Sequence, residues 1–272
     1  MSMSPLVSAA AVVGIGVFAA VLTLLLRRLL PQLDSIDPAP WSSTLQYVAT
    51  AYGVVIGFSI LYLFGAYADA RGAVGDEATS IGTAFDEVLL FDEAAPDVQQ
   101  ALICYSRAAS QYDWPAMRDG SSAPQVDDAY ADLVLSLGRA EDPLEGTFDS
   151  AVATNILVQV GAISTARETR LVAATTGLPV LMWGLVLGGG LLVLTLLYVV
   201  TLPAAPGTQA VLMGLATTFT TVLVLLVVAL NNPFAPGPGR VSPALIDQTT
   251  ASMEQAAPDL AARPCPPPGS AS

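Results

Sequence analysis

Four residues recur at four-residue steps in an uncharged stretch of the chain: Thr50, Val54, Phe58 and Tyr62. On a helix, residues at this spacing share one side. If several copies of the helix surround an axis, the stripe forms stacked narrow rings, and apolar constrictions of this kind gate ion flow by dewetting. The alternative is that the stripe contacts lipid or another helix. The four residues are therefore candidates for a pore neck.

A second set of residues on the same stretch is small. Ala49, Gly53 and Gly57 also follow one another at four-residue steps. Small residues at this spacing let the backbone of a neighbouring helix approach closely. We expect this side of the helix to pack against another helix.

Carboxylates are concentrated in the middle of the chain, where 18 Asp or Glu and 6 Arg lie between Asp69 and Arg170. Charged residues of a helical domain usually face water. The alternative is an acidic vestibule that attracts cations and repels anions. Four doublets also offer oxygen ligands for Ca²⁺, but they lack the alternation and the Gly of a calcium loop, so we expect no metal site. These doublets are Asp76-Glu77, Asp86-Glu87, Asp92-Glu93 and Asp127-Asp128.

The basic residues Arg167 and Arg170 lie shortly before an apolar block. Their position predicts an interfacial anchor and a topology signal. An alternative is that they attract anions at the mouth of a pore. Arginines near the ends of the apolar blocks favour a cytoplasmic location for both termini and the middle domain. Arg71, Arg167, Arg170 and Arg240 lie on that side, against Arg27 and Arg28 on the other.

The overall composition excludes several classes of function. The net charge of −13 argues against a nucleic-acid partner, because phosphates require a basic surface. The chain has no His, the commonest general base and metal ligand, so we expect neither an enzyme nor a bound cofactor. Cys104 and Cys265 are too few and too far apart to indicate a disulfide framework or a metal site.

Hydrophobic residues make up 53% of the chain and charged residues only 12%. Four uncharged blocks are each long enough to cross a bilayer as a helix, which takes about 20 residues. The first block is too long for a signal peptide and lacks its basic start, so we expect a retained span. The blocks cover residues 5–26, 45–67, 178–200 and 208–230.

Periodic apolar residues predict helices elsewhere as well, and the expected fold is all-α. One continuous helix is expected over 43–91, and a proline start signal predicts another over 124–138. We expect a first membrane helix in 1–30, a second in 43–67, an acidic helical domain in 68–177 and a helical hairpin in 178–231. Residues 232–272 form a cytoplasmic C-terminal segment that ends in a disordered Pro-rich tail.

The fourth block ends abruptly at Asn232-Pro233-Phe234. Pro233 cannot continue a helix and biases Asn232 away from helical angles. Phe234 then offers an apolar anchor for the departing chain. The three residues therefore form a stop-and-redirect signal.

The chain resembles the bestrophins in this corner, in its four spans and in its long second helix. The stretch "VVIGFSILYLF" resembles the second helix of that family. A bacterial bestrophin-like group of unknown function is similar at "YADARGAVGDEATSIGTAF", "YDWP", "ARETRL" and "NNPF". The resemblance implies a pentamer in which Phe58 is the neck aromatic, with Val54 and Thr50 one and two turns before it. The residues after the corner, 235–240, contain no carboxylate, so calcium gating is not implied.

We therefore expect a homo-oligomeric ion channel, or a channel-like assembly, in the bacterial inner membrane, with the lipid bilayer and inorganic ions as its partners. The alternative is a membrane-anchored structural or signalling module whose acidic helical domain recruits a cytoplasmic partner.

Overall fold

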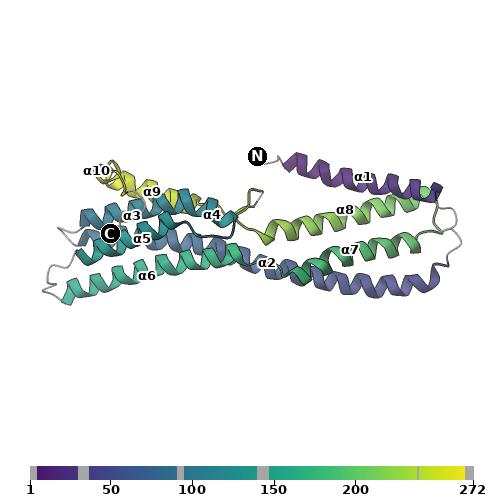
Figure 1. Cartoon of the computed structure of the whole chain (residues 1–272), viewed down its shortest axis with the longest axis horizontal. Helices are drawn as coiled ribbons and strands as arrows, with labels where there is room; N and C mark the ends of the chain where they lie inside the picture. The colour runs from purple at the N-terminus through teal and green to yellow at the C-terminus, as the bar shows by residue number, and fades with distance from the viewer. Residues whose placement is uncertain (1–4, 30–36, 91–94, 140–146, 238, 267–272) are drawn as a thin grey trace. The chain divides into compact units, whose positions relative to one another are not determined.

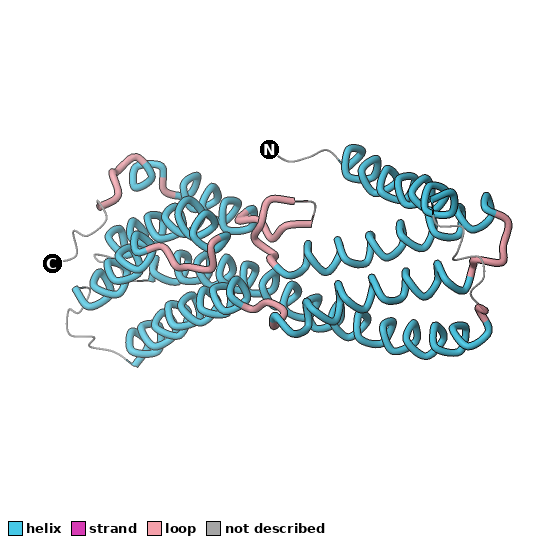
Figure 2. Tube along the Cα trace, turned by 45° about the vertical axis from the view of Figure 1, so that its right-hand side comes forward, coloured by secondary structure: helices cyan, strands magenta, loops and turns pink. Residues whose placement is uncertain are grey.

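The computed structural model describes residues 5–29, 37–90, 95–139, 147–237 and 239–266. All regular structure within these ranges is helical, and Figure 2 shows no strand in them. The predicted all-α class is therefore confirmed. Helices suit this sequence because an uncharged run in hydrocarbon must satisfy its backbone groups internally.

The helices form two compact units. The first, here called the apolar unit, contains α1 (Pro5–Leu29), α2 (Ala39–Glu87) up to Gly65, α7 (Val180–Val200) and α8 (Pro206–Asn231) (Figure 1). Among the described residues, these four helices are long and apolar enough to cross a membrane.

The long helix expected over 43–91 is one α-helix, α2, followed by the 3₁₀ turn Val88–Leu90. It begins earlier than expected because Asp37 accepts a hydrogen bond from the Ala39 N–H at 3.0 Å, which satisfies one free donor at the helix start. No proline interrupts the helix after its first turn, so it continues from the apolar unit into the second unit.

The helices α1 and α8 lie close together at two glycines. A Cβ atom added to Gly16 would overlap the Thr218 hydroxyl and lie 3.0 Å from the Gly214 carbonyl oxygen. A Cβ atom added to Gly214 would lie 3.1 Å from the Gly16 carbonyl oxygen. The close packing of this helix pair therefore depends on the absence of side chains at both positions.

We expect Gly16→Ala to destabilise the apolar unit by about 1–3 kcal/mol, because the Gly214 backbone must move to admit the methyl group. Thermal unfolding in detergent measures the effect. Gly14→Ala is the matched control, since an added Cβ there meets nothing within 4 Å. Equal melting temperatures for the two variants would contradict the close packing.

A second contact in the apolar unit joins α2 to α7. The Tyr52 ring lies against Gly189 and Gly190, where added Cβ atoms would be 2.7 and 3.0 Å from its nearest atoms. At the end of the hairpin opposite its turn, the Asn231 side-chain oxygen accepts a hydrogen bond from the Leu178 N–H at 2.8 Å. The last residue of α8 thus satisfies a free donor just before α7.

The second unit, here called the acidic unit, contains α2 from Ala66 and the shorter helices. A π-helical turn joins the end of α3 directly to the start of α4, so the chain stays helical up to and beyond Trp114. The proline at position 115 lacks an N–H group and begins the new helix at a position where none is needed. The further elements are α3 (Ala95–Ala108), the π turn Ala109–Asp113, α4 (Trp114–Arg118), α5 (Pro124–Arg139), α6 (Thr147–Thr175), α9 (Ala244–Ala256) and α10 (Pro258–Ala261).

Helix α9 was not anticipated in the C-terminal segment. Its buried residues Ile246, Thr250 and Met253 follow at steps of four and three, which is the signal that sequence analysis missed. Residues 267–272, the end of the expected disordered tail, lie outside the described residues.

The two cysteines require a correction. Cys104 on α3 and Cys265 after α10 form a disulfide, with their Cα atoms 5.5 Å apart. Their separation of 161 residues in sequence hid this pairing, because only the packing of α9 and α10 returns the chain to α3.

Candidate functional site

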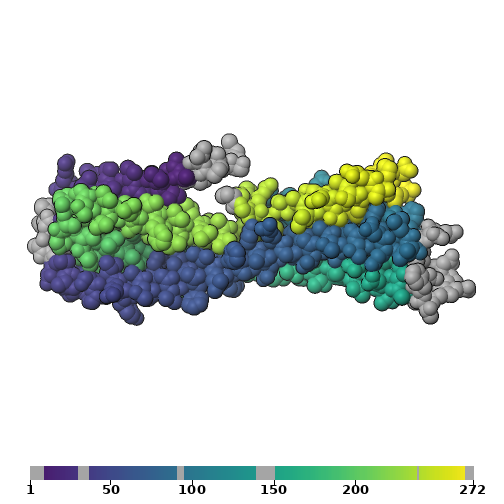
Figure 3. Space-filling view, turned by 180° about the vertical axis from the view of Figure 1, so that it is seen from behind, coloured from purple at the N-terminus to yellow at the C-terminus, as the bar shows by residue number. Residues whose placement is uncertain are grey.

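One flank of α2 in the apolar unit carries the stripe singled out from the sequence. Val54, Phe58 and Tyr62 are 53%, 67% and 54% exposed, and Thr50 is exposed too, with its hydroxyl bonded to the Gln46 carbonyl. Figure 3 shows the outer surface of α2 uncovered in the single chain. The structure thus brings the four neck candidates together on one open surface.

The small residues lie beside this stripe. Gly53 and Gly57 are exposed, Ala49 is half-buried, and a Cβ atom added to either glycine would meet nothing within 4 Å. Within one chain, α2 instead packs through Tyr52, Ile56 and Leu63. The predicted packing role of Ala49, Gly53 and Gly57 stays a prediction, which a neighbouring copy would have to fulfil.

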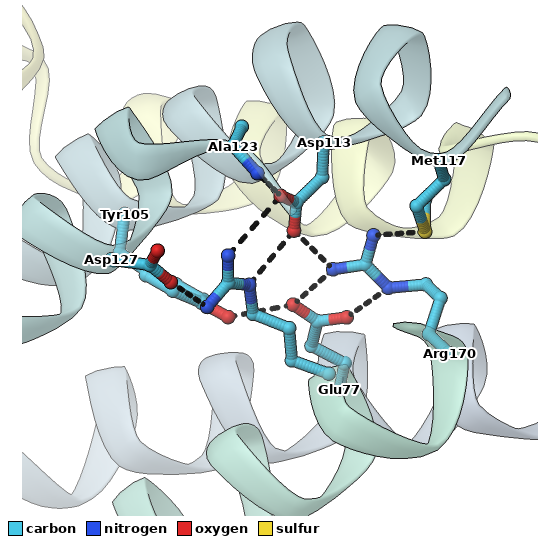
Figure 4. A network of polar contacts seen from close by, with 8 residues as sticks. Glu77, Tyr105, Asp113, Met117, Ala123, Asp127 and Arg170 are labelled. Carbon is cyan, nitrogen blue, oxygen red and sulfur yellow. Dashed lines mark hydrogen bonds and ion pairs between the residues drawn. The ribbon is translucent and has the colours of Figure 1, made fainter. Parts of the chain in front are cut away.

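The acidic unit encloses a network of charged side chains that sequence analysis did not assemble (Figure 4). Glu77 of α2 and Arg170 of α6 are both fully buried and form a two-pronged ion pair. Arg170 Nε donates to Glu77 Oε2 at 2.9 Å, and Arg170 Nη2 donates to Oε1 at 3.0 Å. The Tyr105 hydroxyl of α3 donates to the same Oε1 at 2.8 Å.

Asp113, the last residue of the π turn, extends this network. Its Oδ2 accepts from Arg170 Nη2 at 3.1 Å and from Arg167 Nε at 2.8 Å. Its Oδ1 accepts from the Ala123 backbone N–H at 3.2 Å, and Arg167 also reaches Asp127 of α5 at 2.6 Å. Two buried carboxylates therefore face two guanidinium groups, which is the pairing that buried charges require.

Burial and ion pairing together shift the pKa values of this network. Desolvation raises the pKa of Glu77, although Arg170 and the Tyr105 hydroxyl partly oppose this shift. Desolvation and the charge of Glu77 raise the pKa of Tyr105 well above its usual range, so the phenol remains a donor. For Arg167, burial alone lowers the pKa, but its bonds to Asp113 outweigh burial and raise it.

Aromatic residues close the network on one side. The Arg170 guanidinium lies 4.4 Å from the centre of the Trp114 ring, in cation–π geometry. Phe234 packs edge-on against the same ring, with the ring centres 6.3 Å apart, and the Trp114 N–H donates to the Val241 carbonyl at 3.0 Å.

The residues of the corner therefore have defined positions. Asn232 is extended, with φ −140° and ψ 90°, and ends α8, whereas Phe234 is buried. The Pro233 carbonyl accepts a hydrogen bond from the Val241 N–H at 2.8 Å, which closes a loop after the corner.

Four short stretches singled out from the sequence thus meet around one point. They contribute Glu77, Asp113 with Trp114, Arg167 with Arg170, and Phe234. Both arginines were predicted to be interfacial, and the structure shows their guanidinium groups bound to carboxylates inside the acidic unit. Glu77 could have been noticed earlier, because it lies on the apolar side of α2 that also carries Val74 and Ile81.

The network is closed rather than open to a substrate. Its central groups, Glu77, Asp113 and Arg170, are buried, and each carboxylate oxygen is bonded to a donor. Two grooves lie elsewhere in the acidic unit. One, of about 690 Å³, lies between α2 and α6 and is lined by Asp69 and Asp76; the other, of about 410 Å³, lies between α2 and α9. Among the described residues, no three His, Cys, Asp or Glu side chains are grouped to hold a metal.

Comparison with known proteins gives one family and one fold. A family model described as a Bestrophin-like domain matches residues 13–245. The chain is similar to the crystal structure of a point variant of a bacterial Bestrophin homolog from Klebsiella pneumoniae, with a TM-score of 0.71 and 11% identity over 90% of this chain and 98% of that chain. The same homolog solved by Zn-SAD phasing gives a TM-score of 0.70 at 12% identity, covering 94% and 100%. No curated protein matches the chain.

Proposed function

Because the chain belongs to the Bestrophin-like family, we propose that this helical membrane protein is a homo-oligomeric ion channel whose α2 helices line a central axis. The similar structures support the fold, and the expected pentamer comes from the resemblance to bestrophins. The permeant species are inorganic ions.

The main observation in support of this proposal is the uncovered flank of α2. Exposed Phe58 and Val54 need either hydrocarbon or another protein surface, because water solvates them poorly. Gly53 and Gly57 beside them leave room for the backbone of a second copy. With copies arranged around an axis, Phe58 and Val54 form its narrowest rings, flanked by Thr50 and Tyr62, and these rings gate by dewetting.

The proposed orientation places both termini and the acidic unit in the cytoplasm of a bacterial cell, with the spans in the inner membrane. The arginine distribution supports it, since Arg71 and Arg240 lie near the cytoplasmic ends of the spans together with Arg167 and Arg170. On the opposite side, Arg27 donates a hydrogen bond to the Ala204 carbonyl in the turn between α7 and α8 at 2.8 Å.

We also propose that the protein is not an enzyme. The chain contains no His, and the buried charges of Glu77, Asp113 and Arg170 are paired with one another inside the acidic unit. Catalysis would require an acid or base that reaches a bound substrate.

The test measures oligomeric mass in detergent and then current in planar bilayers with symmetrical sodium chloride. We expect an oligomer with discrete single-channel currents. Silence from demonstrably oligomeric protein would contradict the channel. A monomer or dimer that conducts no ions would instead favour a membrane-anchored module, in which the acidic unit recruits a cytoplasmic partner.

A further inference from the structure

The disulfide between Cys104 and Cys265 lies in a polar setting. Gln100 Nε2 lies 3.4 Å from the Cys104 sulfur, and Arg107 Nη1 lies 3.9 Å from the Cys265 sulfur. Each sulfur therefore has an N–H donor beside it, and the donor at Cys265 carries a positive charge. Such groups favour a thiolate over a thiol, which makes the sulfur a better leaving group in exchange reactions.

The two sulfurs differ in access. Cys104 is 7% exposed on α3, whereas Cys265 is partly exposed in irregular chain between two prolines. An external thiolate therefore reaches Cys265 first. This arrangement differs from a disulfide sealed in an apolar core, where neither sulfur can be attacked before the protein unfolds.

The disulfide fastens the C-terminal end of the chain to α3 together with a small number of polar contacts. Arg107 binds Glu254 at 2.7 Å and donates to the Ala261 carbonyl at 2.9 Å. Gln100 lies 3.4 Å from the Arg263 carbonyl oxygen. The same two α3 side chains thus hold the segment and contact the sulfurs. The segment also includes one buried apolar side chain, that of Leu260 in α10.

We propose that the Cys104–Cys265 pair is a reversible thiol–disulfide exchange site, at which small thiol or dithiol reductants release the segment of residues 258–266 from α3. This inference rests on the cytoplasmic placement proposed above, since the cytoplasm supplies such reductants and disulfides there are usually transient or redox-sensing.

The exchange proceeds in two displacements. A reductant thiolate attacks the Cys265 sulfur, the S–S bond breaks, and its electron pair leaves on Cys104 beside Gln100. A second reductant thiolate attacks the reductant sulfur of the mixed disulfide and expels the Cys265 thiolate beside Arg107. The protein disulfide gains two electrons and two protons, and two reductant thiols become one disulfide. The reverse sequence, with an oxidised disulfide as reagent, closes the pair again.

Full-length protein in detergent, treated with dithiothreitol at neutral pH and trapped with a maleimide mass tag, tests the exchange. We expect both cysteines of the folded protein to become labelled, and amide hydrogen exchange in α10 to rise by roughly tenfold on reduction. Labelling only after unfolding, or unchanged exchange in α10 after reduction, would overturn the proposal. Neither measurement depends on ion conduction, so failure here is distinguishable from failure of the channel proposal.

Two variants serve as controls. Cys104→Ser should show the faster exchange in α10 with or without reductant. Arg107→Gln in the chain with both cysteines tests Arg107 as a positioning residue, because the oxidised protein keeps Arg107 beside Cys265. Glu254 binds Arg107, and Arg263 lies two residues before Cys265 in the sequence. We expect Arg107→Gln to slow the opening of the disulfide by dithiothreitol several-fold at low salt and to weaken the salt dependence of that rate, since the positive charge beside the sulfur is lost. Identical rates and an identical salt dependence would overturn the role of Arg107 in the exchange site.

Discussion

Replacing Arg170 by methionine lowers the free energy of unfolding of the acidic unit by about 3–5 kcal/mol, because two buried carboxylates lose a shared partner. Glu77 then keeps only the Tyr105 hydroxyl, and Asp113 keeps Arg167 and the Ala123 N–H. Methionine retains much of the packing of the arginine stem, so the change mainly removes charge and hydrogen bonds. Chemical unfolding of the full-length protein in detergent, followed by tryptophan fluorescence in a background with Trp41 and Trp183 replaced by Phe, reports on Trp114 and measures the loss.

Asp127→Asn is the matched control for this network. Asp127 binds Arg167 at 2.6 Å, but its side chain is 54% exposed, so water replaces the lost interaction and the expected cost is at most about 1 kcal/mol. A second variant, Glu77→Leu with Arg170→Met, removes the buried pair together and should recover part of the stability. If Arg170→Met cost no more than Asp127→Asn, the network would not be a principal support of the unit.

Replacing Phe58 by alanine increases single-channel conductance several-fold in the proposed channel, because a smaller side chain widens and wets the narrowest ring. The prediction follows from the exposed position of Phe58 on the uncovered flank of α2. Planar-bilayer recordings of single channels measure the change, at equal salt on both sides.

Phe64→Ala provides the matched control for Phe58, because it removes the same side chain from the same helix. Phe64 is also exposed, but six residues turn an α-helix so that it lies about 120° from Phe58. Its substitution should leave conductance near the wild-type value. Equal effects of the two substitutions, or none from Phe58→Ala, would place the axis elsewhere.

Much of the fold follows from local features of the chain. The four spans and the long helix α2 depend on uncharged length and on the absence of breakers, and neighbouring residues alone decide both. Asn232 is extended for an equally local reason, since Pro233 restricts the residue before it. The C-terminal helix α9 was missed because its apolar pattern is short and lies between prolines.

The candidate sites also differ in whether local geometry or long-range packing places their residues. Four-residue spacing was enough to place Thr50, Val54, Phe58 and Tyr62 on one side of α2, because helix geometry alone determines which residues share a side. The burial of Arg170 was beyond local reasoning. A basic residue near an apolar block looks interfacial until a carboxylate 93 positions earlier is brought within hydrogen-bond distance.

By itself, the sequence determined that the fold is helical, which four stretches are apolar enough for a bilayer, and where α8 must end. Tertiary structure alone decided that Glu77 meets Arg170, that Cys104 meets Cys265, and that Gly16 rather than Gly53 meets a helix of the same chain. The physical reason is the distance along the chain over which each kind of interaction acts. Hydrocarbon solvation and backbone geometry act on each segment separately, whereas ion pairs, disulfides and close helix contacts exist only once distant segments have packed together.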